Sequence, residues 1–479
     1  MSDHTDRPVR QERTEGTDPL RLQAALRILQ TTIPQRTSGR VSELTGLVLR
    51  ATAPGARIGE LVAIDRLNEA IRWENRDRTT PMWRMQDGLE TPLYAEVVGF
   101  RGEEVVLLPL GSVAGVGPNS VVRPMGMPLT ILTGSPLLGR VVDAYGEAID
   151  DGPPLTQAQA ELIPTPVERE APEPLRRKRV TEPLSFGLRA IDGCLTVGQG
   201  QRLGLFAGPG LGKSTLLGQI ARNASSDVTV IGLIGERGRE VRDFIDRELD
   251  DDARRRTVVV CATSDQPPLL RLKAALSATA IAEHFRDRGK RVLLLVDSLT
   301  RVARAQREVG LAAGELPARQ GYPPSVFALL PRLVERTGQG EFGSITAVYA
   351  VLVTGTGDET DDIIAEEARA TLDGHIELSR PLAERGHYPA IDVLRSLSRV
   401  MDDVVDSSQR QAAARLREML ALAQRQRDLV LLGAYQRGSD PATDEALQKQ
   451  PAIEAFLRQG RYERCDFAQT KELLLRAIS

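Results

Sequence analysis

The sequence predicts an α/β protein made of three consecutive parts: a small β-barrel, a core with a mostly parallel sheet, and a helical C-terminal region. Short β-branched runs punctuated by glycine fill residues 38–125, a pattern typical of short strands that close into a barrel. From about residue 203 to 399, apolar runs alternate with helical stretches, which favours a parallel sheet with helices on both faces. Beyond Met401 the apolar residues recur at helical spacing.

Length and composition limit the classes of protein that fit. A chain of 479 residues is too long for one ordinary core, and 41% hydrophobic and 27% charged residues are typical of a globular protein. The net charge of −3 gives no electrostatic reason for nucleic acid or an anionic membrane as the main partner. Because Cys194, Cys261 and Cys465 form no paired motif, and no membrane span or secretory signal stands out, we expect a cytoplasmic protein.

The first 37 residues are predicted to lie outside the barrel. They are polar at first and are expected to be disordered. A short amphipathic helix follows, in which Leu22, Leu26 and Leu29 recur at helical spacing. Whether its apolar stripe packs on this chain, on a partner or on a membrane surface stays open.

The barrel prediction rests on runs such as "GELVAI" and "EEVVLLPLG". The run "EVVGFRGEEVVLL" predicts a hairpin with Arg101 and Gly102 in its turn, because glycine readily adopts the positive φ of a tight turn. A stretch that carries both tryptophans, Trp73 and Trp83, interrupts the pattern and is interpreted as an inserted loop of unknown purpose.

The core is assigned to residues 126–400 and the helical region to 401–479. The run "QAAARLREMLALAQRQ" predicts a helix with one apolar face. That face is formed by Leu416, Met419, Leu420 and Ala423.

The stretch "AGPGLGKST" matches a phosphate-binding P-loop (Walker A motif), in which backbone N–H groups and a helix N-terminus surround an anion. An apolar strand pattern, "LGLFA", precedes it and a helical pattern follows, as this mechanism requires. Lys213 is expected to reach the β- and γ-phosphates and Ser214 to bind Mg²⁺, while Ala207 departs from the usual first glycine. The predicted nucleotide-binding residues are Gly208, Pro209, Gly210, Leu211, Gly212, Lys213, Ser214 and Thr215.

Two further runs supply carboxylates. "LLLVDSLTR" predicts a buried strand that ends at Asp297, a candidate Mg²⁺ ligand at the sheet edge where nucleotides bind. "IGLIGERGREV" predicts a strand that ends at Glu236, followed by Arg237 and by Glu240, a second candidate metal ligand. A nucleotide hydrolase must orient an attacking water, and Glu236 is well placed to do so. The alternative interpretation of "IGLIGERGREV" is that its glutamates and arginines are only solvated charges on the protein surface.

Several longer stretches resemble one family over most of the chain, from about Gly39 to the C-terminus. They are "GLFAGPGLGKSTLL", "GERGREV", "DSLTRVARAQREVGLAAGELPARQGYPPSVFALLPRLVERTG", "LDGHIELSR", "GHYPAIDV" and "SLSRVM". The family comprises the type III secretion ATPases of injectisomes and their flagellar export counterparts, which are relatives of the catalytic subunit of rotary ATP synthases. The resemblance implies an N-terminal β-barrel, a RecA-like P-loop ATPase core and a C-terminal helical domain.

The resemblance also implies roles for individual residues. Glu236 would activate the attacking water, and Arg237 would lie close to the phosphates. Tyr388 would stack on adenine; without the family, a core tyrosine is the simpler interpretation. Arg399 would be an arginine finger that reaches the γ-phosphate of a neighbouring subunit, which implies a ring of identical subunits, by analogy a homohexamer.

The function implied is hydrolysis of ATP with Mg²⁺ to energise type III secretion, by chaperone release, cargo unfolding and export. The partners implied are a coiled-coil central stalk, a stator dimer, chaperone–cargo complexes and an export gate at the inner membrane, where the ring would be peripheral. The alternatives are a flagellar export ATPase, a noncatalytic nucleotide-binding subunit, against which Glu236 argues, and a ring helicase. The few aromatic residues of the barrel argue against nucleic acid as a partner. One departure from the family is the loop "TGTGDETDD", where an acid-rich loop is usual.

Overall fold

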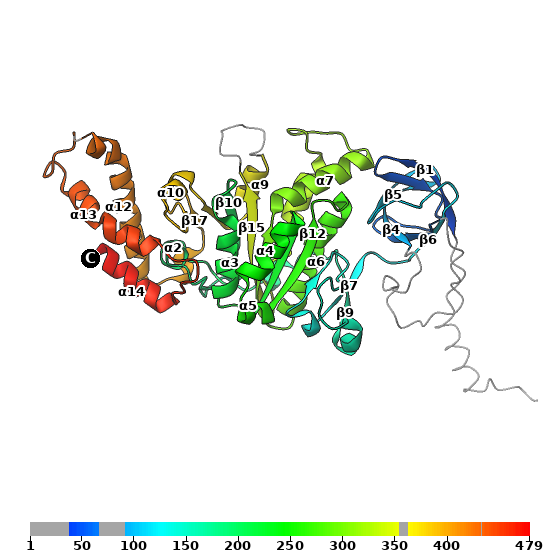
Figure 1. The fold of residues 1–479 in the computed structure, drawn as a ribbon, viewed down its shortest axis with the longest axis horizontal. Helices are drawn as coiled ribbons and strands as arrows, with labels where there is room; N and C mark the ends of the chain where they lie inside the picture. Colours follow the sequence, from blue (N-terminus) through cyan, green and yellow to red (C-terminus); the bar gives the residue numbers. More distant parts are fainter. Residues whose placement is uncertain (1–37, 67–91, 354–362, 433) are drawn as a thin grey trace, which may run out of the picture.

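The computed structural model describes residues 38–66, 92–353, 363–432 and 434–479. The molecule is elongated, with a barrel at one end, the sheet of the core in the middle and a group of helices at the other end (Figure 1). The order of these parts in space follows their order in the chain. The fold class predicted from the sequence is therefore confirmed.

Three predicted features lie outside the described residues. They are the helix around Leu22–Leu29, the insertion that carries Trp73 and Trp83, and the loop at 354–362. Within the described ranges, no helix is both long and apolar enough to cross a membrane. Cys194, Cys261 and Cys465 are free and buried, as expected of unpaired structural thiols.

The barrel closes through six antiparallel strands in the order β1-β2-β5-β4-β3-β6. Alternate residues point inward, so that Leu49, Val62 and Leu107 are fully buried. The strands are β1 (Gly39–Thr45), β2 (Val48–Ala51), β3 (Leu61–Ile64), β4 (Leu93–Arg101), β5 (Glu104–Pro109) and β6 (Val121–Pro124).

The predicted hairpin joins β4 to β5. Arg101 still pairs with Glu104, so the two-residue connection is Gly102 with Glu103, and the placement of Arg101 in the turn was wrong. Gly102 has φ +64°, the left-handed conformation that a tight two-residue hairpin loop requires.

The core contains a sheet whose strand order is β17-β16-β10-β15-β13-β11-β12-β8, with β14 paired to β15. All neighbours are parallel except β17 and β14, which run antiparallel to their partners. β7 (Thr130–Thr133) and β9 (Ile163–Pro166) form a separate antiparallel pair, and β8 of the sheet lies between them in the chain. The strands of the sheet are β8 (Val141–Val142), β10 (Arg202–Ala207), β11 (Val228–Glu236), β12 (Thr257–Thr263), β13 (Arg291–Asp297), β14 (Gly338–Gln339), β15 (Ser344–Leu352), β16 (Gly374–Glu377) and β17 (Leu397–Ser398).

Helices cover both faces of this sheet, which explains why its strands are apolar throughout rather than alternating. In β13, Leu294 packs into the cluster on one face and Leu295 into the cluster on the other. One face carries α2 (Arg189–Cys194), α3 (Lys213–Asn223), α4 (Gly238–Glu248) and α5 (Asp251–Arg255), and the other carries α6 (Pro268–Arg286), α7 (Leu299–Ala313), α8 (Pro324–Glu335) and α9 (Ile363–Thr371). The short elements are η2 (Ser135–Leu137), η3 (Leu155–Glu161), η4 (Pro174–Arg176), α10 (Arg380–Glu384) and α11 (Met401–Val404).

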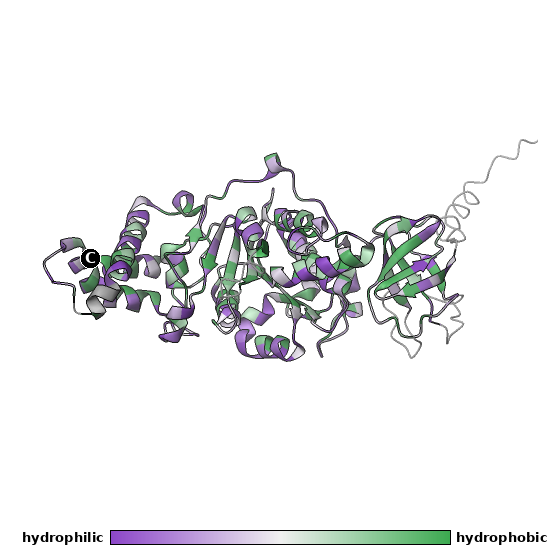
Figure 2. Cartoon of the chain, turned by 90° about the horizontal axis from the view of Figure 1, so that it is seen from above, coloured by the Kyte–Doolittle hydropathy of each residue, from purple (hydrophilic) through white to green (hydrophobic). Residues whose placement is uncertain are grey.

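The C-terminal region consists of α12 (Ser407–Leu431), α13 (Pro441–Leu457) and α14 (Phe467–Ile478). The apolar face predicted for α12 is confirmed, since Leu416, Met419 and Ala423 are buried and Leu420 packs against the same cluster. Figure 2 shows hydrophobic residues concentrated in the strands of the core and barrel, and hydrophilic residues along many of the outer helices.

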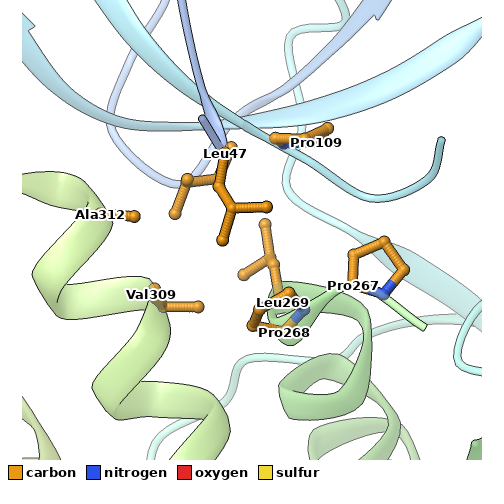
Figure 3. Close-up of a pocket in the computed structure, with 8 residues that line it drawn as sticks. Leu47, Pro109, Pro267, Pro268, Leu269, Val309 and Ala312 are labelled. Atoms are coloured by element: carbon orange, nitrogen blue, oxygen red, sulfur yellow. The ribbon is translucent and has the colours of Figure 1, made fainter. Parts of the chain in front are cut away.

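The barrel meets the core at the start of α6 and the end of α7. Figure 3 shows this apolar contact, formed by Leu47, Pro109, Pro267, Pro268, Leu269, Val309 and Ala312. Beside it, the buried Lys273 of α6 forms ion pairs with Glu96 of β4 and with Glu168. Apolar packing and the ion pairs of the buried Lys273 together hold the barrel against the core.

Candidate active site

The P-loop connects β10 to α3. Gly210 and Gly212 have φ values of +76° and +86°, so residues with side chains would be strained at both positions. Because α3 begins at Lys213, its first N–H groups lie free at the loop and can bind an anion. Ala207 is the last residue of β10 and has no positive φ, so alanine is accepted where glycine is usual.

Lys213 joins two carboxylates that come from different strands. Its Nζ forms an ion pair with Asp297 at the end of β13, and lies 3.5 Å from Oε1 of Glu236 at the end of β11. The two carboxyl side chains are buried, with 3% and 9% of their surface exposed. Parallel strands end at the same edge of a sheet, which is why residues 84 positions apart in the chain meet here.

The acidities of these groups are set by their neighbours. Burial raises the pKa of Asp297, and the ion pair with Lys213 only partly opposes it. Burial would also raise the pKa of Glu236, but its hydrogen bonds with Glu240 and Arg301 and the charge of Lys213 hold that pKa below its ordinary value. The hydrogen bond with Glu236 raises the pKa of Glu240. Of the two glutamates, Glu236 therefore has the lower pKa.

Arg301 is a residue of the site that the sequence interpretation missed. It lies in the first turn of α7 and forms an ion pair with Glu236. Gly235 makes room for it, since a Cβ at that position would lie 3.0 Å from Cδ of Arg301. The signal was available in "DSLTR", where the arginine follows Asp297 by four residues and so returns to the same edge of the sheet.

Arg237 and Glu240 lie at the solvent edge of the site. Arg237 precedes α4, and its exposed side chain lies 3.8 Å from Glu240 in the first turn of that helix. Ser214 is exposed in the first turn of α3, next to the partly exposed Thr215. These hydroxyl and charged groups are open to a ligand that occupies the P-loop.

Tyr388 is not a core tyrosine, so that alternative is wrong. It is 48% exposed, and a Cβ on Gly212 would lie 3.8 Å from its ring. The backbone N–H of Gln459 donates to its carbonyl oxygen at 2.9 Å, which ties it to the C-terminal region. The structure therefore brings this aromatic ring to the edge of the P-loop.

The structure does not bring Arg399 to the P-loop of its own chain. Its backbone N–H donates to Asp373, a residue level with Arg202 at the amino end of β10, whereas the P-loop follows the carboxyl end of the same strand. At about 3.3 Å per residue the two ends are separated by roughly 15 Å. The side chain of Arg399 is exposed, and among the residues that the structure describes it donates only to the carbonyl oxygen of Arg369, at 3.3 Å.

The donors around the P-loop fit Mg²⁺. Oxygen ligands are the ones this ion prefers, and it commonly takes one or two carboxylates together with the phosphates of its substrate rather than an all-protein cage. Ser214 and Asp297 supply a hydroxyl and a carboxylate of this kind. Across the ranges that the structure describes, no cluster of three or more His, Cys, Asp or Glu residues could hold a metal without such phosphates.

The fold and this site define a P-loop ATPase. Two family models match the chain: the nucleotide-binding domain of the ATP synthase alpha/beta family over residues 187–398, and the T3SS EscN ATPase C-terminal domain over residues 405–476.

Individual relatives cover nearly all of the chain. It is 46% identical to a type 3 secretion system ATPase of Pseudomonas syringae pv. tomato, over 93% of this chain and 94% of that protein. It is 45% identical to a flagellum-specific ATP synthase of Bacillus subtilis, over 93% and 96% of the two chains. The structure of the assembled ATPase EscN of enteropathogenic E. coli superposes with a TM-score of 0.82 at 40% identity, covering 92% of this chain and all of that one. The chain belongs to the family of type III secretion and flagellar export ATPases, as its motifs predicted.

Proposed function

We propose that this ATPase works as a ring of identical subunits that hydrolyses ATP to energise type III protein secretion. The observation that carries the proposal is the contact of Lys213 with both Asp297 and Glu236 at the P-loop. A lysine held between two carboxylates is poised to exchange them for phosphate oxygens when a nucleotide enters.

In the proposed reaction, water attacks the γ-phosphorus in line and the bond to the β-phosphate oxygen breaks, releasing ADP and phosphate. Glu236 orients this water and accepts its proton, a role for which an ionised carboxylate is required. Lys213 and Arg237 bind the phosphate oxygens, and Ser214, Asp297 and Glu240 are the candidate residues for holding Mg²⁺, directly or through water. When bound, the ion neutralises charge on the β- and γ-phosphate oxygens. Tyr388 is proposed to stack on the base.

The ring is proposed because Arg399 lies too far from its own P-loop to act there. An exposed arginine at the opposite end of β10 can serve a neighbouring subunit, and a chain that carries both halves of a site can close a ring of identical copies. The relative EscN is described as assembled, and a second structure as its complex with a central stalk, EscO. By analogy we propose a homohexamer with a coiled-coil stalk.

The remaining partners and the location are proposed from the family alone. They are a stator dimer, chaperone–cargo complexes and an export gate, with the ring cytoplasmic and peripheral at the inner membrane. A flagellar export role is the second candidate, because the flagellar relative is as similar as the secretion relative. Expression in strains that lack either ATPase, scored for secretion and for motility, would separate the two roles.

We also propose domain limits at residues 125 and 400. The last strand of the barrel ends at Pro124, and the strands of the central sheet lie between Val141 and Ser398. These limits can be checked by expressing 126–400 alone and measuring whether it folds and binds ADP.

The direct test is Mg²⁺-dependent ATP hydrolysis measured over a series of protein concentrations. We expect Glu236→Gln to lower the rate at least about 100-fold while ADP binding persists, because the water loses its proton acceptor. Glu472→Gln, a change of the same kind on the exposed surface of α14, is the matched control and should leave the rate unchanged. Full activity of Glu236→Gln, or a specific activity independent of concentration, would contradict the proposal.

A further inference from the structure

A cavity of about 1050 Å³ separates the ATPase core from the C-terminal helices. One wall comes from the segment after β16, including α10, and the other from α12 and α13; Figure 1 shows α10 between the core and these helices. The cavity reaches the P-loop only through Gly208 and Leu211. It thus adjoins the proposed nucleotide site at these two residues, but within the described residues neither Lys213 nor Tyr388 lines it, so most of the cavity lies outside that site.

The charges that line this cavity do not balance. Two of its acidic groups already have partners, since Glu377 lies 2.8 Å from Arg395 and Glu454 lies 3.9 Å from Arg458. The third, Asp392, accepts backbone N–H groups of the turn that follows it. The lining arginines are Arg369, Arg380, Arg385, Arg395 and Arg458, against Glu377, Asp392 and Glu454.

The excess positive charge belongs to Arg380 and Arg385. In the part of the chain that the structure describes, Arg380 makes no ion pair, and its Nη2 would lie 3.8 Å from a Cβ on Gly208, at the P-loop end of the cavity. Within the same described ranges, Arg385 donates only to the carbonyl oxygen of Pro381, at 3.0 Å. Burial lowers the pKa of His387, which also lines the cavity, so the imidazole is neutral at pH 7 and adds no further charge.

The remaining wall is largely apolar. It includes Leu382, Leu394, Leu420, Ala423, Leu447 and Leu457. A concave apolar surface of this volume with a few convergent charged groups is typical of a small-molecule site. Arginine without a carboxylate partner favours an anion, because its planar N–H groups match acidic oxygens.

We propose that this cavity binds a small anionic amphiphile, a molecule with an apolar body and one or two acidic groups. Arg380 and Arg385 bind the acidic groups, and the apolar residues of α12 and α13 hold the body. Such a ligand would tie the P-loop wall to the C-terminal helices without entering the nucleotide site. It would therefore lower kcat for ATP hydrolysis and leave KM for ATP nearly unchanged.

The probe for this site is 8-anilinonaphthalene-1-sulfonate, which combines an aromatic body with a sulfonate. We expect the full-length chain, saturated with ADP, to bind one probe per chain in a fluorescence titration. Arg380→Gln combined with Arg385→Gln should weaken binding about 3- to 10-fold, as the loss of two partly exposed ionic contacts implies. Gln424→Trp should block binding, because this exposed side chain of α12 faces the cavity and tryptophan would fill it.

Two controls separate this site from other apolar surfaces. Arg176→Gln removes an exposed arginine elsewhere and should leave probe binding unchanged. Retained ADP binding by every variant shows that the variants are folded, and the rate of ATP hydrolysis with and without probe gives kcat and KM separately. Probe binding to the nucleotide-free chain that is lost once ADP saturates it, or wild-type affinity in both the double arginine variant and Gln424→Trp, would overturn the proposal.

Discussion

At the scale of single residues, Lys213 links the two carboxylates of the candidate site. It contacts Asp297 and Glu236, and Glu236 in turn contacts Arg301. Two cations therefore share one carboxylate, which is the proposed proton acceptor. Phosphate oxygens would compete for both cations and leave Glu236 free to hold water.

Arg301→Ala is expected to lower kcat while ADP binding persists, because Glu236 loses the cation that orients it and holds its pKa low. The expected loss is about 10- to 100-fold. Arg301→Lys should restore part of the rate, since it returns the charge without the planar N–H groups. The pH profile of kcat distinguishes this role from a general loss of stability: its acidic limb should move to higher pH in Arg301→Ala, and an unmoved limb would argue against the role.

His284 makes the stability of the core dependent on pH. It is buried in α6, where its Nδ1 lies 2.7 Å from the hydroxyl oxygen of Thr133, and burial together with Arg288 and Arg169 lowers its pKa to about 4. Asp287 opposes this shift only in part. In the unfolded chain the pKa is about 6.5. The neutral form thus stabilises the fold above pH 6.5, and that stability is lost as the pH falls from 6.5 towards 4.

We expect His284 to cost about 1 kcal/mol of stability at pH 5 relative to pH 7.5, allowing for solvent screening. Thermal unfolding of wild type and His284→Gln at both pH values measures this, because glutamine can still bond to Thr133 but does not titrate. The variant should lose less stability than wild type between the two pH values. Equal losses would show that His284 is not the titrating group.

At the scale of elements, α6 connects the central sheet to the barrel. Its Lys273 is 2% exposed and pairs with Glu96 of the barrel and with Glu168, which raises the pKa of the lysine despite its burial. Removing one partner of a buried ion pair lowers the free energy of unfolding, because the other charge stays buried without a partner. Replacing the whole pair with apolar residues often does not lower it.

Lys273→Met is therefore expected to destabilise the contact between barrel and core by about 3 kcal/mol, because two carboxylates lose their cation. Adding Glu96→Leu to this variant should recover a large part of the loss. Urea unfolding followed by limited proteolysis between barrel and core would measure both effects. If the loss of unfolding free energy in the double variant equals the sum of the losses in Lys273→Met and Glu96→Leu, the cluster acts only through packing.

At the scale of the whole molecule, each end of β10 lies beside part of a proposed active site. In the proposed ring these two parts belong to different active sites, each completed by a neighbouring subunit. The P-loop follows one end, and Arg399 lies near the other. This geometry makes a test by mixing subunits possible, because either half can be removed separately.

Glu236→Gln and Arg399→Ala should each be inactive alone and recover activity when mixed. If the subunits assort at random in a 1:1 mixture, about a quarter of the interfaces pair an intact catalytic glutamate with an intact arginine. We therefore expect roughly a quarter of the wild-type rate. A mixture that stays inactive, although light scattering shows mixed rings, would place the action of Arg399 within its own chain.

The sequence by itself determined the class of fold, the P-loop and the ends of the strands that carry Glu236 and Asp297. These features depend on neighbouring residues in the sequence. They are the glycines of the P-loop, the apolar runs of strand length and the apolar residues at helical spacing. It also determined the family, because long motifs occur in a consistent order.

Only the tertiary structure decided which of these residues meet. The strand order β10-β15-β13-β11 brings Lys213, Asp297 and Glu236 together, adds Arg301 to them and leaves Arg399 apart. The exposure of Tyr388 and the cavity beside α10 likewise arise from contacts between segments far apart in the chain. Spacing along a sequence fixes which way a side chain points from its own element, but distances between elements depend on how the whole sheet and its helices pack.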